Sequence, residues 1–155
     1  MELADIVSRD AIVPCAKVAS KRQLIQLLAE KASELVGIDS TVIFETLVHR
    51  EQLGSTGLGN GIAIPHGKIK GLPGVTAVFA RLEQPIEFDA VDDQPVDLVV
   101  MLLAPEGSGA DHLKALSRVA RLLRIDGVVD RLRATRDEAK LRDILVTPLE
   151  AINAA

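Results

Sequence analysis

The segment DLVVMLLAP, from Asp97 to Pro105, is the most informative part of the sequence about the fold. Its middle, LVVMLLA, is an unbroken apolar run without polar alternation. A strand that is apolar on both of its faces is buried on both, as in the centre of a sheet that helices cover on either side. The same run is far too short to span a bilayer. We therefore expect a central strand between two helical layers.

Two further strands are expected before the central one. The segment VTAVFARL, residues 75–82, alternates apolar and polar side chains, and Ile62 and Ile64 show the same period of two. No helical pattern separates residues 75–82 from the central strand. Two strands that follow each other directly do not form a purely parallel pair, so the sheet is predicted to be mixed.

Amphipathic segments on both sides of these strands predict helices. Capping boxes begin at Ser20 and Thr135, while Gly37 and Gly127 lie where helices are expected to end. The apolar spacing places the helices at about residues 21–36, 40–50, 111–127 and 135–145. We predict an α/β fold, a single-domain sandwich over residues 1–155 in which a mixed β-sheet is flanked by helices on both faces.

Composition excludes several classes of protein. A net charge of -4 and an aromatic content of 2% argue against nucleic-acid partners, which select for positive charge and stacking side chains. The single cysteine, Cys15, cannot form an internal disulfide. The N-terminal residues lack the apolar core of a signal peptide. We therefore expect a cytoplasmic protein that binds no nucleic acid and does not insert into membranes.

The glycine-rich stretch GSTGLGNGIAIPHGK, residues 54–68, contains five of the 11 glycines. Glycine permits backbone amides to approach a ligand closely, which suits phosphate oxygens. A nucleotide-binding P-loop is not supported, because five residues separate Gly61 from Gly67 where the motif has four, and Lys68 is followed by Ile69 in place of a serine or threonine. The stretch also lacks the G-x-G-x-x-G pattern of dinucleotide-binding folds.

The remaining feature of this stretch is His66, between Pro65 and Gly67. The proline stiffens the backbone, and the glycine is expected to leave a ring face open. A neutral imidazole can accept a phosphoryl group covalently when nearby groups neutralise the oxygens. Candidate phosphate contacts are Arg50, the hydroxyls of Ser55 and Thr56, the backbone at Gly67, and His112 in the first turn of a helix.

Each candidate also has an ordinary structural interpretation. Arg50 is placed to interact with the negative end of a helix, and Ser55 and Thr56 suit a turn. A zinc site would need His49 beside the other two histidines, but its side chain should point about 100° away from that of Arg50 around the helix. We therefore predict no metal and no cofactor.

Three segments carry a family resemblance: HREQLGSTGLGNGIAIPHGK, FDAVDDQPVDLVVMLLAP and DHLKALSRVARLL. They resemble the type 2 enzyme IIA domain of the phosphotransferase system, fructose/mannitol class, and are most similar to its nitrogen-regulatory members, from about Asp5 to Val146. The resemblance implies that His66 is phosphorylated, that His112 is the second active-site histidine, and that Arg50 faces the phosphate. The implied donor is a small histidine phosphocarrier protein of the HPr or NPr kind.

Two outcomes of phosphorylation stay open at this point. The protein could relay the phosphoryl group to an enzyme IIB in sugar uptake, or it could act as a phosphorylation-dependent regulator of proteins yet to be identified. Because the chain contains no recognisable IIB or membrane segment, and because its greatest resemblance is to the nitrogen-regulatory members, we favour the regulator.

Overall fold

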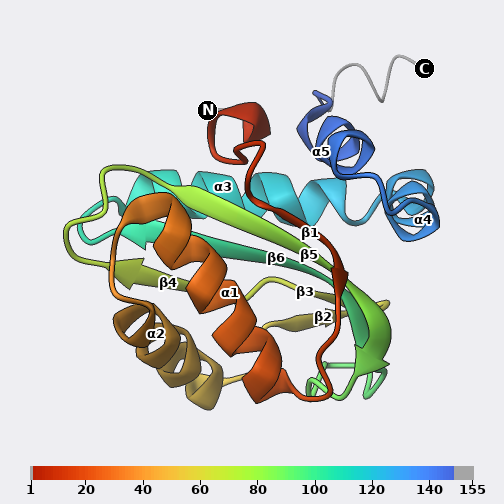
Figure 1. Cartoon of the computed structure of the whole chain (residues 1–155), viewed down its shortest axis with the longest axis horizontal. Helices are drawn as coiled ribbons and strands as arrows, with labels where there is room; N and C mark the ends of the chain where they lie inside the picture. The colour runs from red at the N-terminus through yellow and green to blue at the C-terminus, as the bar shows by residue number, and fades with distance from the viewer. Residues whose placement is uncertain (1, 149–155) are drawn as a thin grey trace.

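The computed structural model describes residues 2–148 and shows one mixed sheet between two layers of helices (Figure 1). This confirms the predicted α/β architecture. The strands are β1 (Ile12–Ala16), β2 (Gly57–Gly59), β3 (Ile62–Ala63), β4 (His66–Ile69), β5 (Thr76–Ile86) and β6 (Val96–Pro105). The helices are a short 3₁₀ turn η1 (Leu3–Asp5), α1 (Lys21–Val36), α2 (Ser40–Leu53), α3 (Gly109–Leu122), α4 (Asp126–Ala134) and α5 (Glu138–Val146).

The sheet is built around β6, as the apolar run predicts. The strand order is β1-β5-β6-β3-β2, and β4 also pairs with β6. Strands β5 and β6 are antiparallel, whereas β1 is parallel to β5, and both β3 and β4 are parallel to β6. The antiparallel pair comes from the direct connection between β5 and β6, which no helix interrupts.

Strands β3 and β4 form one strand that is interrupted at a proline. Ile62 pairs with Leu98 and His66 pairs with Leu102, so the register on β6 is the same before and after the interruption. Pro65 lies in the gap, and its ring removes the backbone N–H that a continuous ladder would need. The Pro65 carbonyl still accepts from the amide of Leu102 at 2.9 Å. The interruption therefore leaves Ile64 and Pro65, the two residues before His66, outside the paired strand segments.

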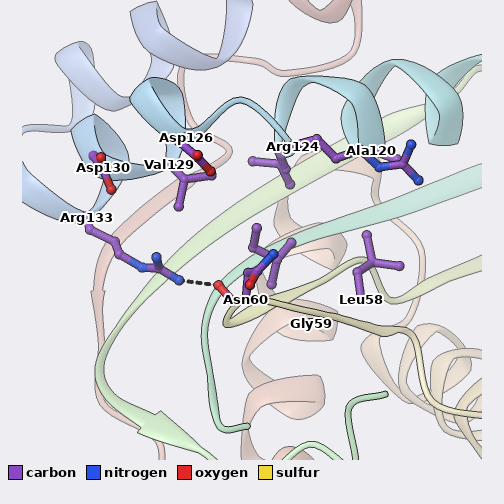
Figure 2. Close-up of a pocket in the computed structure, with 11 residues that line it drawn as sticks. Leu58, Gly59, Asn60, Ala120, Arg124, Asp126, Val129, Asp130 and Arg133 are labelled. Atoms are coloured by element: carbon purple, nitrogen blue, oxygen red, sulfur yellow. Dashed lines mark hydrogen bonds between the residues drawn. The ribbon is translucent and has the colours of Figure 1, made fainter. Parts of the chain in front are cut away.

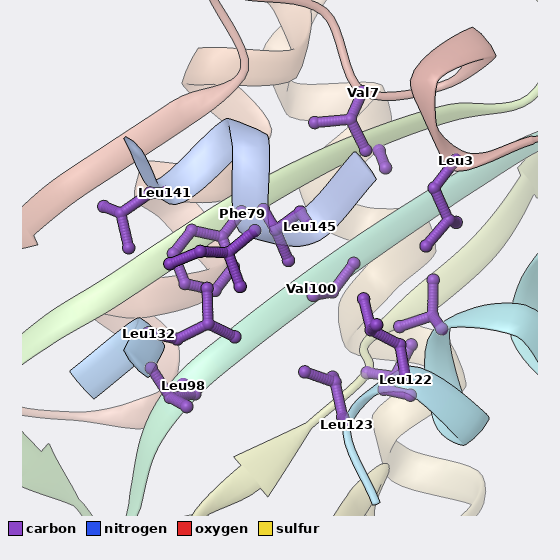
Figure 3. Close-up of a cluster of buried hydrophobic side chains, with 14 of the residues drawn as sticks. Leu3, Val7, Phe79, Leu98, Val100, Leu122, Leu123, Leu132, Leu141 and Leu145 are labelled. Carbon is purple, nitrogen blue, oxygen red and sulfur yellow. The ribbon is translucent and has the colours of Figure 1, made fainter. Parts of the chain in front are cut away.

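Side chains of β6 alternate between two separate apolar cores. Leu98, Val100 and Leu102 belong to the core under α3, α4 and α5, part of which Figure 3 shows with Phe79 and Leu132. The intervening side chains of β6 belong to the core under α1 and α2. Because both faces are covered, all residues from Val96 to Ala104 except Asp97 are buried.

Helices α1 and α2 agree with the sequence signals. Ser20 Oγ accepts from the amide of Gln23 at 3.2 Å, and the Gln23 side chain accepts from the amide of Ala19 at 2.7 Å. Gly37 ends α1 with a left-handed φ of 73°, which a glycine adopts without steric cost. Helix α2 is capped by Asp39 and reaches Leu53, slightly beyond the predicted end.

Two predicted helix boundaries are wrong. Helix α3 ends at Leu122, and Gly127 does not end it but lies inside the additional helix α4. Buried valine and leucine side chains of α4 pack into the core and outweigh the low helix propensity of one glycine. Helix α5 is capped by Asp137, whose carboxylate accepts from the amide of Lys140 at 3.1 Å, so Thr135 does not cap it.

Strands β1 and β4 were not predicted from the sequence, because both are short and lack the usual strand pattern. Strand β1 (IVPCA) contains a proline, and β4 (HGKI) contains a glycine and two polar side chains, so neither has a clear strand pattern. Within residues 2–148, no helix is both long and apolar enough to cross a membrane.

Candidate active site

The fold brings His66 and His112 together from two different segments. His66 is the first residue of β4, and His112 lies in the first turn of α3, directly after the central strand. Their ring centroids are 5.3 Å apart, and the ring planes meet at 81°. His49, by contrast, is exposed on α2, as predicted. The two adjacent rings define the candidate site.

A main-chain carbonyl fixes the orientation of the His66 ring. Nδ1 of His66 lies 2.8 Å from the carbonyl oxygen of Ile64. A carbonyl can only accept, so Nδ1 carries the proton and donates it, and the lone pair of the neutral ring is on Nε2. His66 is half-buried. Its Nε2 is therefore the nitrogen with nucleophilic character.

His112 has a buried nitrogen without a hydrogen-bond partner. His112 is only 6% exposed. Among the described residues, its Nε2 is the one buried side-chain nitrogen or oxygen atom that has no hydrogen-bond partner. Leaving a buried polar atom unpaired costs about 1–3 kcal/mol, so such atoms are uncommon and often mark functional sites. The missing partner makes this nitrogen a candidate contact for a ligand.

Burial favours the neutral form of both imidazoles. Burial is the largest cause that lowers the pKa of His66, and the charge of Arg50 lowers it further, while the Ile64 carbonyl and Glu51 act in the opposite direction. Burial also lowers the pKa of His112, with smaller contributions from the charges of His66 and Lys68. A neutral His66 retains the lone pair that a phosphoryl acceptor needs.

Arg50 lies in the last turn of α2, close enough for its charge to affect His66. One guanidinium nitrogen, Nη1, donates to the carbonyl oxygen of Gly54 at 2.8 Å. This is the helix-end contact expected of a cation at that position. Contact between Arg50 and a phosphate stays a prediction.

The two hydroxyls predicted to touch phosphate both have protein partners. Ser55 Oγ donates to the Phe88 carbonyl at 2.9 Å and accepts from the Gly57 amide at 3.1 Å. Thr56 is buried, and its hydroxyl donates to the carboxylate of Glu51. Phosphate contacts by Ser55 and Thr56 therefore stay predictions, and a contact would require these bonds to be shared or exchanged.

Gly67 has a packing role that the sequence did not indicate. It is buried, and a Cβ atom at this position would lie 2.7 Å from Cγ2 of Thr46 on α2. The absence of a side chain thus lets β4 approach α2, which is a different reason for glycine from the predicted open ring face. A phosphate contact by the Gly67 backbone stays a prediction.

Sequence reasoning missed Glu51, a buried carboxylate beneath the site. It is 9% exposed and forms an ion pair with Lys21 of α1, with 2.7 Å between Nζ and Oε2. A signal was present, because Ile43, Leu47 and Glu51 follow one another at four-residue steps and so share a helix face. A carboxylate on an otherwise apolar face predicts a buried partner.

A cavity of about 480 Å³ lies elsewhere, between the β2–β3 turn and helices α3 and α4 (Figure 2). None of its lining residues is a histidine. Arg133 on its wall donates to the Asn60 carbonyl at 2.6 Å and pairs with Asp97 at 2.9 Å. These bonds already occupy the guanidinium, so the cavity has less evident chemistry than the two histidines.

Comparison with known proteins agrees with this geometry. Residues 5–147 match the family described as "Phosphoenolpyruvate-dependent sugar phosphotransferase system, EIIA 2". A "Nitrogen regulatory protein" of Bradyrhizobium diazoefficiens is 52% identical over 148 residues, which cover 96% of this chain and 97% of that protein. A "PTS system fructose-specific EIIA component" of Haloferax volcanii is 35% identical, with coverage of 85% and 86%.

A solved structure of a relative has the same architecture. The crystal structure of "Nitrogen Regulatory Protein IIA-Ntr from Neisseria meningitidis" superposes with a TM-score of 0.88 at 35% identity, covering 92% of this chain and 98% of that one. The family match over residues 5–147 includes both histidine-bearing segments. The chain therefore belongs to the EIIA type 2 family of the phosphoenolpyruvate-dependent sugar phosphotransferase system.

Proposed function

We propose that Nε2 of His66 accepts a phosphoryl group from a histidine phosphocarrier of the HPr or NPr kind, and that the phosphorylated protein regulates other proteins. Membership of the family supports a regulatory role in the phosphotransferase system. The observation that carries the assignment to His66 is the pair of rings: Nδ1 of His66 is bound to Ile64, and the unpartnered Nε2 of His112 lies in the adjacent ring.

The proposed transfer is an in-line displacement. The lone pair on Nε2 of His66 forms the new N–P bond while the N–P bond of the carrier breaks, and the electrons of the old bond stay on the carrier nitrogen. Nδ1 of His66 keeps its proton on the Ile64 carbonyl. In the tautomer with a proton on Nε2, His112 donates to a phosphoryl oxygen, and the charge of Arg50 stabilises the developing negative charge.

Labelling experiments test the acceptor directly. The protein is incubated with phosphoenolpyruvate, the first enzyme of the system and a histidine phosphocarrier, and its intact mass is measured. We expect a gain of one acid-labile phosphoryl group that is absent from His66→Ala. His49→Ala is the matched control, because His49 is an exposed histidine on α2, and it should be labelled normally. Normal labelling of His66→Ala would exclude His66 as the acceptor.

The second candidate function is a phosphoryl relay to an enzyme IIB in sugar uptake. The similarity to a fructose-specific EIIA component favours this candidate. The two functions are distinguished by adding purified IIB domains to the phosphorylated protein. Rapid loss of the label to one of them would favour the relay, whereas retention of the label would favour a regulator.

A further inference from the structure

We propose that Glu51 is a positioning residue for His66, which it orients through Thr56 and the backbone of Ile64. The proposal deepens the proposed function and rests on it, because it concerns how the phosphoryl acceptor is held. Glu51 does not contact the reacting nitrogen. It anchors the segment whose carbonyl binds the opposite nitrogen of the ring.

The first step is the anchoring of Thr56 by Glu51. One carboxylate oxygen of Glu51 accepts from the amide of Thr56 at 3.2 Å, and the other accepts from the Thr56 hydroxyl. Bonds to both the backbone and the side chain fix the position and the orientation of this residue. Lys21, with Nζ 2.7 Å from Oε2, neutralises the buried carboxylate.

The second step connects Thr56 to His66 through two backbone bonds. The Thr56 carbonyl accepts from the amide of Ile64 at 3.1 Å, and the Ile64 carbonyl accepts from Nδ1 of His66 at 2.8 Å. Ile64 lies in the interruption between β3 and β4, outside the two strand segments that pair with β6. The amide of Ile64 is therefore bound by the Thr56 carbonyl, and Glu51 holds Thr56.

The same cluster joins segments that are distant in the sequence. Lys21 Nζ also donates to the Phe88 carbonyl at 3.3 Å and lies 4.3 Å from the centre of the Phe88 ring. Ser55 donates to the same carbonyl at 2.9 Å. These contacts hold α1, α2 and the glycine stretch in one arrangement. Loss of the Glu51 carboxylate would leave the half-buried Lys21 without its counter-charge and Thr56 without its acceptors.

The charged groups around His66 determine how a substitution of Glu51 changes the pKa of His66. Arg50 and Glu51 face the ring from α2, and His112 faces it from α3, with Lys68 of β4 acting on His112. Glu51 raises the pKa of His66, against the lowering by burial and by Arg50. Substitution by glutamine should therefore lower the pKa of His66 further, as well as loosen its ring.

The experiment compares Glu51→Gln with Asp97→Asn. Both changes replace the acid of an ion pair by its amide. Asp97 pairs with Arg133, which binds the Asn60 carbonyl in the middle of the same glycine stretch. The Asp97 carboxylate does not bind Thr56 or Ile64. Long-range proton–nitrogen NMR spectra report the tautomer and the pKa of His66, and labelling gives the rate of phosphorylation. Urea unfolding gives the folded fraction of each variant, by which its phosphorylation rate is corrected.

We expect Glu51→Gln to reduce the corrected phosphorylation rate at saturating carrier by about one to two orders of magnitude, since small misplacements of a reacting group have effects of this size. The Michaelis constant for the carrier should change little, because Glu51 is buried. The spectra should show mixed His66 tautomers and a lower pKa. Asp97→Asn should retain the wild-type tautomer and rate, whatever it does to stability.

A second, milder variant tests the same path in case Glu51→Gln does not fold. Thr56→Val keeps the shape of the side chain and removes the hydroxyl bond to Glu51, so it should shift the tautomer in the same direction to a smaller extent. If both variants fold and retain the wild-type tautomer, pKa and rate, the positioning role is excluded. If wild type is not labelled although a control acceptor is, the proposed function fails, and the spectra still decide whether Glu51 orients the ring.

Discussion

At the scale of single residues, His112 is the side chain whose surroundings are incomplete. Its Nε2 is buried and unpartnered within the described residues, while the ring of His66 lies 5.3 Å away between centroids. In the proposed function, a phosphoryl group on His66 supplies the partner that Nε2 of His112 lacks. Of the two histidines, His66 is thus suited to accept the group and His112 to stabilise it.

Removing the His112 imidazole should slow phosphorylation without removing the acceptor. In His112→Ala, we expect the labelling rate of His66 to fall by about 10²–10³-fold, the loss seen when one donor to a developing anion is deleted. The final extent of labelling should still approach one phosphoryl group per chain. The rate is measured by quenched-flow mass spectrometry and corrected for the folded fraction. A wild-type rate would show that His112 does not contact the transferred group.

At the scale of elements, the site depends on how closely β4 approaches α2. The strand carries His66, and the helix carries Arg50 and Glu51. Between them, Gly67 faces Thr46 with no room for a Cβ atom. The distance between strand and helix therefore sets the distance between the acceptor and its charged neighbours.

Gly67→Ala should separate these two elements. The added methyl group would lie 2.7 Å from Cγ2 of Thr46, and overpacking of this kind costs about 1–3 kcal/mol. Thr46→Ala removes Cγ2 and leaves a nearest contact of 3.9 Å, so the double variant should recover most of the lost stability. Urea unfolding of both single variants and the double variant measures the coupling. Additive losses would mean that the clash is not with Thr46.

The elements also show where sequence reasoning succeeds and where it stops. Strand β6 and helix α1 were predictable because their burial and capping are encoded within the segment itself. Strand β4 was not predictable, because its four residues show no clear strand pattern and it forms a strand by pairing with β6. The histidines follow from local motifs, whereas the Glu51–Lys21 pair joins two helices, and pairing between distant residues is not visible in either segment alone.

At the scale of the whole molecule, two apolar cores cover opposite faces of the sheet that carries His66. Residues of both cores come from β6. His66 lies on β4, which pairs with β6, and His112 lies on α3, the next helix after β6 in the chain. Burial in this setting lowers the pKa of both rings. The protonation of the two histidines is therefore linked to the stability of the fold.

This linkage predicts a loss of stability on mild acidification. The pKa values of both histidines are lower in the folded state than the ordinary value of about 6.5, so the unfolded chain binds more protons in the interval between the two values. The free energy of unfolding should thus fall as the pH decreases below about 6.5 toward the folded-state values. Urea unfolding at several pH values measures it, and a His66→Ala/His112→Ala variant should show a shallower dependence.

The proline interruption of the β3–β4 strand has a consequence for how robust the chemistry is. Because Pro65 breaks the ladder, the oxygen that orients His66 belongs to the main chain at Ile64. A peptide oxygen does not titrate in the physiological range, and no side-chain substitution can delete it. Selection of the reactive nitrogen therefore does not depend on a titrating side chain, and it changes when the backbone at Ile64 is displaced.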